Sequence, residues 1–241
     1  MRLLPAILLL SIASVVRAAA VADPPLVVAV KEGNLAGLKA AIASGAAVGD
    51  KDQYGWTAAM WAVGHGNAAM VSALTAAGGD PAPKDAGTFN PVIEAAKGGR
   101  ADVVPLLAAR GLSCGAKDEL GVPALSYAVA QVSTATVQAL LACKADVNAK
   151  DGDGFTPLIR AAQLGRAGQV RFLLSKGASP NARDNSGYTA LMWAAHGGSA
   201  EAVQALLAAK ADPALKGKDG RTARQIADKR GRADAAALLP P

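Results

Sequence analysis

A single period runs through most of the chain and restricts it to a repeat architecture. One fixed step separates Thr156 from Thr189 and Thr189 from Thr222, and three such steps separate Thr57 from Thr156. Three further columns keep the same step: Val71, Val104, Val137, Val170 and Val203; Leu74, Leu107, Leu140, Leu173 and Leu206; and Asp52, Asp85, Asp118, Asp151 and Asp184. A unit this short cannot bury an apolar face alone, so the pattern predicts units that stack on their neighbours.

The residues that fill this period resemble the ankyrin repeat. The clearest units are DGDGFTPLIRAAQLGRAGQVRFLLSKGASPNAR, residues 151–183, and DNSGYTALMWAAHGGSAEAVQALLAAKADPALK, residues 184–216. The resemblance implies an all-α ankyrin-repeat solenoid of about seven helix-turn-helix units, each of about 33 residues, with β-turn fingers. We place this domain at residues 23–241, with units that start near residues 23, 52, 85, 118, 151, 184 and 217, the first without its finger.

Local signals within one unit agree with this assignment. Thr156 suits the N-cap of a first helix and Pro157 its first turn, because Thr can accept from an orphan N–H and Pro needs no acceptor. Gly165 suits the left-handed residue that ends that helix. Val170 and Leu173 follow at helical spacing and predict one apolar face on a second helix.

The chain departs from the family pattern in two places. The usual TPLH histidine is replaced by Met60, Ile93, Ser126, Ile159 and Met192. Since that histidine commonly bonds between fingers in the family, we expect the fingers to be less rigid. The unit that starts at Asp118 lacks a capping threonine, so we expect residues 121–129 to form the softest join.

Residues 1–22 have the layout of a secretory signal peptide. Arg2 gives a positive start, residues 3–16 are mostly apolar, and Ala20 and Ala22 each end an A-x-A cleavage sequence. The alternative is a membrane anchor or an amphipathic first helix. We predict a periplasmic or secreted protein, with no stable membrane insertion after the signal is removed.

The two cysteines fit an oxidising compartment. Cys114 and Cys143 lie near the ends of the second helices of adjacent units, and stacking would bring these ends together. A disulfide that closes a loop of this length could add about 3–4 kcal/mol to stability. The alternative is two small buried residues without a bond.

Charge and composition argue against two classes of protein. The formal net charge is +6, and residues 23–241 hold 23 basic against 19 acidic side chains with no run of five like charges. A nucleic-acid-binding protein usually concentrates its cations in a stripe or run, so we expect no nucleic-acid partner. The longest apolar run is shorter than the ~20 residues that cross a bilayer, so a polytopic membrane protein is excluded.

The sequence offers little catalytic chemistry. His65 and His196 are four units apart and cannot share a metal ion or act as an acid–base pair. The segment 146–152 resembles a calcium loop but has Lys150 at the fifth ligand position and lacks the closing glutamate. We therefore predict no catalytic residues, no metal, no cofactor and no enzyme activity.

Two columns of aromatic residues are the candidate partner-binding residues. The finger column holds Trp56, Phe89, Phe155 and Tyr188, and the first-helix column holds Trp61, Tyr127 and Trp193. Exposed aromatic side chains supply large contact areas at low entropic cost. The alternative is that they pack between adjacent fingers and helices.

A basic column directly precedes the aspartates: Lys51, Lys84, Lys117, Lys150, Arg183 and Lys216. It is either a cationic strip for an acidic partner or a set of residues that pair locally with the neighbouring aspartates.

Three functions remain open, and the first is favoured. The chain is expected to be a monomeric, non-enzymatic protein-interaction module that inhibits, protects or scaffolds a cell-envelope protein through its fingers and concave helix face. A second hypothesis is a secreted effector that binds host proteins. A third is a small-molecule binder or an enzyme, which would need a deep polar pocket that no pattern in the sequence suggests.

Overall fold

The computed structural model describes residues 22–83, 87–131 and 134–241, and in these residues the regular secondary structure is helical. Residues 1–21 of the predicted signal peptide, and also Lys84 and Asp85, lie outside the described residues. The helices are α1 Pro25–Lys31, α2 Leu35–Ala43, α3 Ala58–His65, α4 Ala68–Ala76, α5 Pro91–Lys97, α6 Val103–Ala109, α7 Ala124–Ala130, α8 Ala135–Ala142, α9 Pro157–Gln163, α10 Ala167–Ser175, α11 Ala190–Gly197, α12 Ala200–Ala208, α13 Ala223–Lys229 and α14 Ala233–Ala237.

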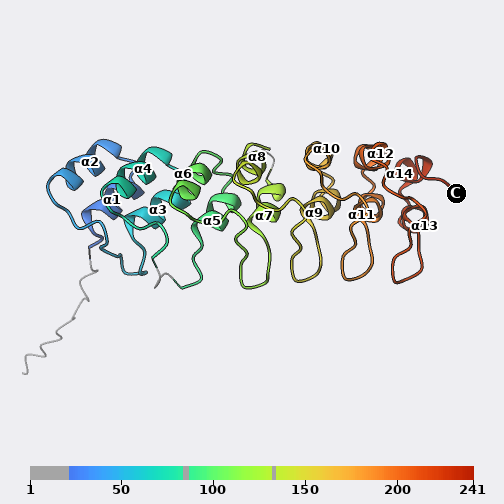
Figure 1. Ribbon diagram of the computed structural model, residues 1–241, viewed down its shortest axis with the longest axis horizontal. Coiled ribbons are helices and arrows are strands. Elements are labelled where there is room, and N and C mark those ends of the chain that lie inside the picture. The colour runs from blue at the N-terminus through green and yellow to red at the C-terminus, as the bar shows by residue number, and fades with distance from the viewer. Residues whose placement is uncertain (1–21, 84–86, 132–133) are drawn as a thin grey trace, which may run out of the picture.

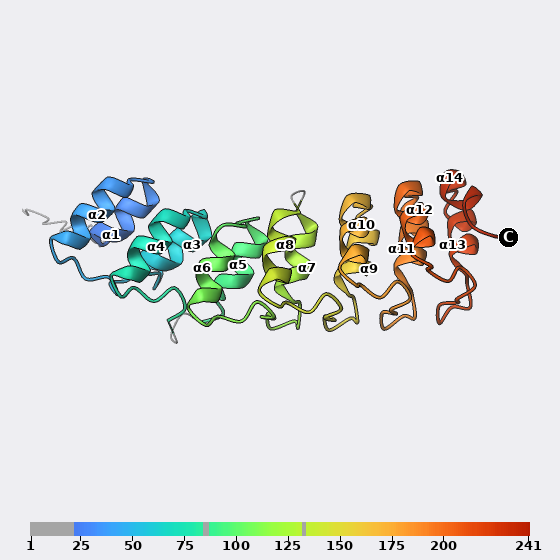
Figure 2. The same cartoon turned by 45° about the horizontal axis from the view of Figure 1, so that its top comes forward.

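Consecutive helix pairs stack side by side in chain order, from α1 and α2 at one end to α13 and α14 at the other (Figure 1). The odd-numbered helices form one row and the even-numbered helices a second, and the fingers extend from the side of the odd-numbered row. The main helix–helix contacts join the two helices of a unit or the corresponding helices of adjacent units. This arrangement persists in the turned view of Figure 2 and confirms the predicted all-α ankyrin-repeat solenoid.

The core is a continuous apolar layer between the units. The valine column and the leucine column of the second helices are completely buried in all five units. Alanine pairs such as Ala95–Ala96 and Ala194–Ala195 are buried equally well where first helices approach one another. Burying one leucine contributes roughly 1.5–3 kcal/mol, and each of these leucines is buried by an adjacent unit as well as its own.

Side-chain caps fix where the first helices begin. The hydroxyl oxygens of Thr57, Thr156, Thr189 and Thr222 each accept a hydrogen bond from the backbone N–H three residues later. Such a cap typically contributes about 1 kcal/mol. The predicted N-cap role of the threonine column is therefore confirmed.

Hydrogen bonds also link successive fingers, in place of the missing histidines. Lys117 Nζ donates to the carbonyl of Lys150 (2.8 Å), Lys150 Nζ donates to that of Arg183 (2.9 Å), and the Arg183 guanidinium donates to that of Lys216 (2.7 Å). We call these residues the finger ladder. These bonds couple adjacent fingers although the histidine is absent, and the lower rigidity of the fingers stays a prediction.

The unit that starts at Asp118 differs from its neighbours as predicted. Helix α7 follows Pro123 and has no side-chain cap, although the Ala124 N–H donates to the Ala116 carbonyl (2.9 Å). The hydroxyl of Ser126 is buried without a hydrogen-bond partner among the described residues. An unsatisfied buried hydroxyl costs about 1–3 kcal/mol, which is consistent with a soft join in this region.

A disulfide connects this unit to the preceding one. Cys114 lies in the loop after α6, Cys143 caps the C-terminus of α8, and their Cα atoms are 6.0 Å apart. The bond therefore joins the two units beside the uncapped helix.

Two lysines occupy backbone positions that suit glycine. Gly78 and Gly177 have φ angles of 90° and 86° after the second helix, and Lys144 and Lys210 fill the same column with φ angles of 69° and 62°. A left-handed conformation costs a residue with a side chain roughly 1–2 kcal/mol.

We predict that Lys210→Gly raises the free energy of unfolding by about 0.5–1 kcal/mol, because relief of backbone strain exceeds the entropic cost of glycine. Urea denaturation followed by circular dichroism measures the change. Gly177→Lys is the matched reverse variant and should destabilise by a similar amount. A lower stability for Lys210→Gly would show that the lysine side chain contributes more than the strain costs.

Candidate functional site

The two aromatic columns lie on one side of the molecule and form a single surface. Each finger aromatic residue directly precedes the N-cap of a first helix, and each helix aromatic residue lies in the following turn of such a helix. We call this surface the finger–helix face; its aromatic residues are Trp56, Phe89, Phe155, Tyr188, Trp61, Tyr127 and Trp193. All seven side chains are half-buried.

Aromatic contacts gather these residues into a cluster near the N-terminus. The Trp56 ring lies 5.0 Å from the Trp61 ring and 5.0 Å from the Phe89 ring, measured between centroids. His65 packs against the other side of Trp61 at 5.5 Å. Lys31, from the preceding unit, places its Nζ 4.4 Å from the Trp61 ring centroid, a cation–π distance.

A second cluster forms near the C-terminus. Trp193 lies 5.3 Å from Phe155 of the preceding finger and 5.7 Å from Tyr188 of its own finger. His196 packs on Trp193 at 5.5 Å, and the Arg160 guanidinium lies 4.6 Å from the Phe155 ring. This cluster therefore joins aromatic and cationic side chains from two successive units.

The helix aromatics recur at every second unit. Trp61, Tyr127 and Trp193 follow one another at two repeat steps, and Lys97 lies over Tyr127 at 5.0 Å as Lys31 lies over Trp61. Packed helices are about 8–10 Å apart, so successive helix aromatics on this face are separated by roughly 16–20 Å. A partner that contacts them all must therefore span several units.

Buried aspartates hold the fingers against the first helices. In the Asp184 carboxylate, Oδ1 accepts from the backbone N–H groups of Ser186 and Tyr188 (both 2.8 Å), and Oδ2 accepts from the Trp193 indole N–H (2.8 Å). Asp52 makes the same bond to the Trp61 indole at 2.9 Å. One carboxylate thus fixes both the turn of a finger and the orientation of an aromatic side chain on the helix.

In the units that start at Asp118 and Asp151, a polar side chain other than tryptophan takes the same place. The Tyr127 hydroxyl donates to Asp118, and the Arg160 guanidinium donates to Asp151 at 3.1 Å. The spacing from the aspartate to its helix partner is nine residues in each case. This constant spacing is visible in the sequence and could have indicated the contact between each aspartate and its helix partner.

The protonation of these groups follows from their hydrogen bonds. Burial favours a higher pKa for Asp52, but bonds from the Trp56 N–H, the Trp61 indole and the Lys31 ammonium hold the pKa below its ordinary value. The hydrogen bond to Asp118, reinforced by burial, raises the pKa of the Tyr127 phenol to about 12. The Asp52 carboxylate therefore stays ionised and Tyr127 stays a donor at neutral pH.

The predicted aromatic residues were expected either to form an exposed surface or to pack between adjacent fingers and helices. The structure shows part of each arrangement. Six of the seven pack against one another in the two clusters, Tyr127 contacts Lys97 instead, and each keeps part of its surface exposed. The sequence analysis missed the cations Lys31, Lys97 and Arg160, which lie on the rings. Lys31 and Lys97 reach these rings from the preceding unit, whereas Arg160 lies in the same unit as Phe155.

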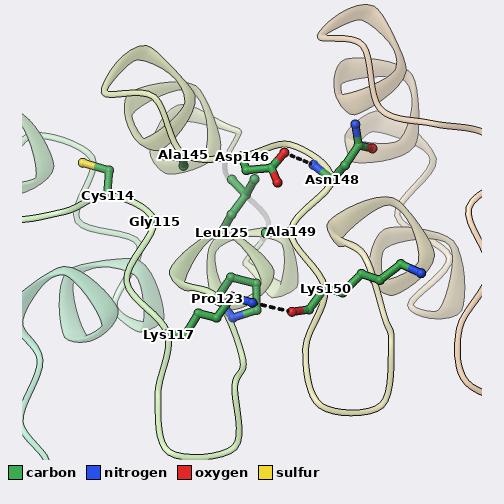
Figure 3. A pocket seen from close by; sticks show the side chains of 10 residues that line it. All are labelled: Cys114, Gly115, Lys117, Pro123, Leu125, Ala145, Asp146, Asn148, Ala149 and Lys150. Carbon is green, nitrogen blue, oxygen red and sulfur yellow. Dashed lines mark hydrogen bonds between the residues drawn. The ribbon is translucent and has the colours of Figure 1, made fainter.

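Three residues of the basic column, Lys117, Lys150 and Arg183, bond to the next finger and do not pair with the neighbouring aspartates. Figure 3 shows Lys117 reaching from one finger to the backbone of Lys150 in the next, beside a hollow of about 250 Å³. Cys114 of the disulfide and Asp146 line the same hollow. The ladder cations thus have a structural role, and the alternative of aspartate pairing is wrong for Lys117, Lys150 and Arg183.

The part of the chain that the structure describes includes both histidines, His65 and His196. No three His, Cys, Asp or Glu side chains lie together there in a way that could hold a metal ion. No helix there is long and apolar enough to cross a membrane. His65 and His196 each pack on a different tryptophan, in the two separate clusters.

Comparison with known proteins agrees with the geometry. A family model described as "Ankyrin repeats (3 copies)" matches residues 26–118 and 111–184, and one described as "Ankyrin repeats (many copies)" matches residues 173–227. The chain belongs to the ankyrin repeat family. Ankyrin repeats generally mediate protein–protein interactions and are typically not enzymes. A search of curated proteins found no match.

The Tyr127–Asp118 bond gives a prediction for alkaline pH. Because the folded-state pKa of Tyr127 is raised above that of the unfolded chain, its contribution to stability is complete below pH ~10 and is lost as pH rises toward about 12. Tyr127→Phe should lower the free energy of unfolding by about 1–2 kcal/mol near neutral pH, and the difference from the unaltered chain should shrink above pH ~10. Urea denaturation at several pH values measures both effects.

Tyr54→Phe is the matched control, because Tyr54 is 70% exposed at a finger tip. Its effect on stability should be small and should not change with pH in this way. A constant difference between Tyr127→Phe and the unaltered chain across the alkaline range would contradict the assignment.

Proposed function

We propose that this chain is a non-enzymatic protein-interaction module that is exported from the cytoplasm and binds a cell-envelope protein. Its binding surface is the finger–helix face, and binding inhibits, protects or scaffolds the partner. The observation that carries the proposal is the pair of aromatic clusters, half-exposed on one face and held in place by buried carboxylates.

Preorganisation makes this face suitable for binding. An aromatic anchor loses affinity when it must be ordered on association, at about 0.5–1.5 kcal/mol for each immobilised side chain. The indoles of Trp61 and Trp193 are already oriented by Asp52 and Asp184. Tyr188 is likewise held, because its hydroxyl donates to Asp219 at 2.6 Å. These side chains are therefore already ordered in the folded chain, and binding a partner loses little further side-chain entropy.

Two features support export. The layout of residues 1–22 is typical of a secretory signal peptide. The Cys114–Cys143 disulfide suits an oxidising compartment, where such bonds form and persist.

We predict that replacing Trp56, Phe89, Phe155 and Tyr188 together by alanine abolishes capture of the partner from a periplasmic extract. The four changes remove the finger half of both clusters. Affinity pull-down with mass spectrometry measures capture, and circular dichroism checks that the helices are retained.

The control is the double variant Tyr54→Ala and Leu120→Ala. These side chains are 70% and 75% exposed, lie in fingers and fall outside the aromatic columns. It should capture the partner as well as the unaltered chain does. If the four-alanine variant retains its helices and also its capture, this face is not the binding surface.

We predict that the chain recovered from the periplasm or the medium begins at Val21 or Asp23, because the signal peptide is removed after Ala20 or Ala22. The same sample, denatured without reductant, should contain no reactive thiol. N-terminal sequencing and thiol labelling test the two points. An intact N-terminus together with two reactive thiols would reject export.

A further inference from the structure

The positive charge of the chain is concentrated in its last unit. Residues 216–241 carry seven basic side chains, Lys216, Lys218, Arg221, Arg224, Lys229, Arg230 and Arg232, and three acidic ones, Asp219, Asp228 and Asp234. Residues 23–215 carry sixteen of each sign, so the net charge of +4 in residues 23–241 comes entirely from Lys216 and the last unit. A terminal unit needs a polar outer surface, but either sign of charge would satisfy that need.

Several of these cations border the finger–helix face. A hollow of about 60 Å³ between α11 and α13 is lined by Tyr188, His196, Arg221, Ile226, Lys229 and Arg230. A larger hollow of about 400 Å³ is also lined by Tyr188, together with Trp193, Lys218 and Asp219. The two hollows together combine an apolar aromatic surface with a cationic rim.

Few carboxylates balance these cations. Asp219 accepts from the Tyr188 hydroxyl and from Arg221, and Asp228 pairs with Arg224. In the described part of the chain, no carboxylate lies within ion-pair distance of Lys218, Lys229 or Arg230. The excess of positive charge affects His196. Burial lowers the pKa of its imidazole, and the charges of Arg230 and Arg232 lower that pKa further.

We propose that this end of the finger–helix face, which we call the cationic pocket, binds an acidic segment of the partner protein. The segment places an apolar side chain against Tyr188 and Trp193 and its carboxylates beside Lys229 and Arg230. Charge complementarity selects this occupant, since the pocket offers unpaired cations beside an aromatic surface. The inference rests on the proposed function and names the class of partner.

Fluorescence anisotropy of the purified chain with a labelled synthetic peptide, rich in glutamate and containing two leucines, tests the proposal. Lys229→Glu with Arg230→Glu should weaken binding about tenfold or more, because attraction is replaced by repulsion. The milder pair Lys229→Gln and Arg230→Gln should weaken it in the same direction, and it keeps the test valid if charge reversal disturbs α13.

The matched control is Lys39→Glu with Arg171→Glu. Both residues are exposed on helices of the even-numbered row, which we call the outer row: Lys39 on α2 and Arg171 on α10. This control changes the net charge as much as Lys229→Glu with Arg230→Glu does, but at a distance from the pocket. This control should bind the peptide within about twofold of the unaltered chain if the pocket, and not net charge, attracts it. Equal weakening by the control and the pocket variants would overturn the proposal.

Two further probes separate an acidic peptide from a general polyanion. Replacing the leucines of the peptide by serine should weaken binding, because the aromatic surface loses its contact. A single-stranded oligonucleotide and a heparin fragment should bind more weakly than the leucine-containing peptide. Binding of either polyanion at equal or higher affinity would reject the acidic protein segment as the occupant.

The outcome is distinguishable from failure of the proposed function. If the four-alanine variant of the finger column loses the periplasmic partner but the pocket variants keep it, the finger–helix face binds a protein and the acidic segment is wrong. If the pocket variants lose both the peptide and the periplasmic partner while the outer-row control keeps both, the two proposals hold together.

Discussion

The whole structure depends on burial of apolar surface between neighbouring units. The valine and leucine columns are inaccessible to solvent only because adjacent helix pairs cover them. No unit could keep its two short helices in isolation, since helices of five to nine residues are marginal without tertiary contacts. The finger–helix face is held in place by this stacking, because each finger is joined to a first helix that the neighbouring units hold.

Much of this fold could be predicted from residue columns. Thr156 and Pro157 mark a helix start by their own chemistry, and the Val170 column marks a buried stripe by its spacing. These features depend on a few neighbouring residues, so they recur in the sequence of successive units. Two contacts were not predicted. Lys31 reaches Trp61 in the next unit, and Arg160 of a first helix folds back over Phe155 of its own finger. Both depend on the direction that a long side chain takes in three dimensions. The aromatic residues of the site were identified, but not the cations that accompany them.

The aspartate column shows how one residue can serve the fold and the surface together. Asp184 closes the turn of its finger with one oxygen and orients Trp193 with the other. The last unit carries Gly217 in this column, where a Cβ would lie 2.5 Å from Cε1 of Tyr188. The carboxylate is found instead at Asp219, where it accepts from the Tyr188 hydroxyl. The face therefore ends in a different arrangement, with the half-buried ring of Tyr188 beside cations of α13.

The finger ladder affects how such a chain can change in length. Each cation donates to the main-chain oxygen of the corresponding residue one unit later, so the acceptor does not depend on which side chain is present there. Duplication or loss of a whole unit would preserve every donor–acceptor match along the fingers. An insertion of one residue within a finger would displace one acceptor and one donor at once, and would break the links to both neighbours. The ladder thus favours growth of the array by complete modules.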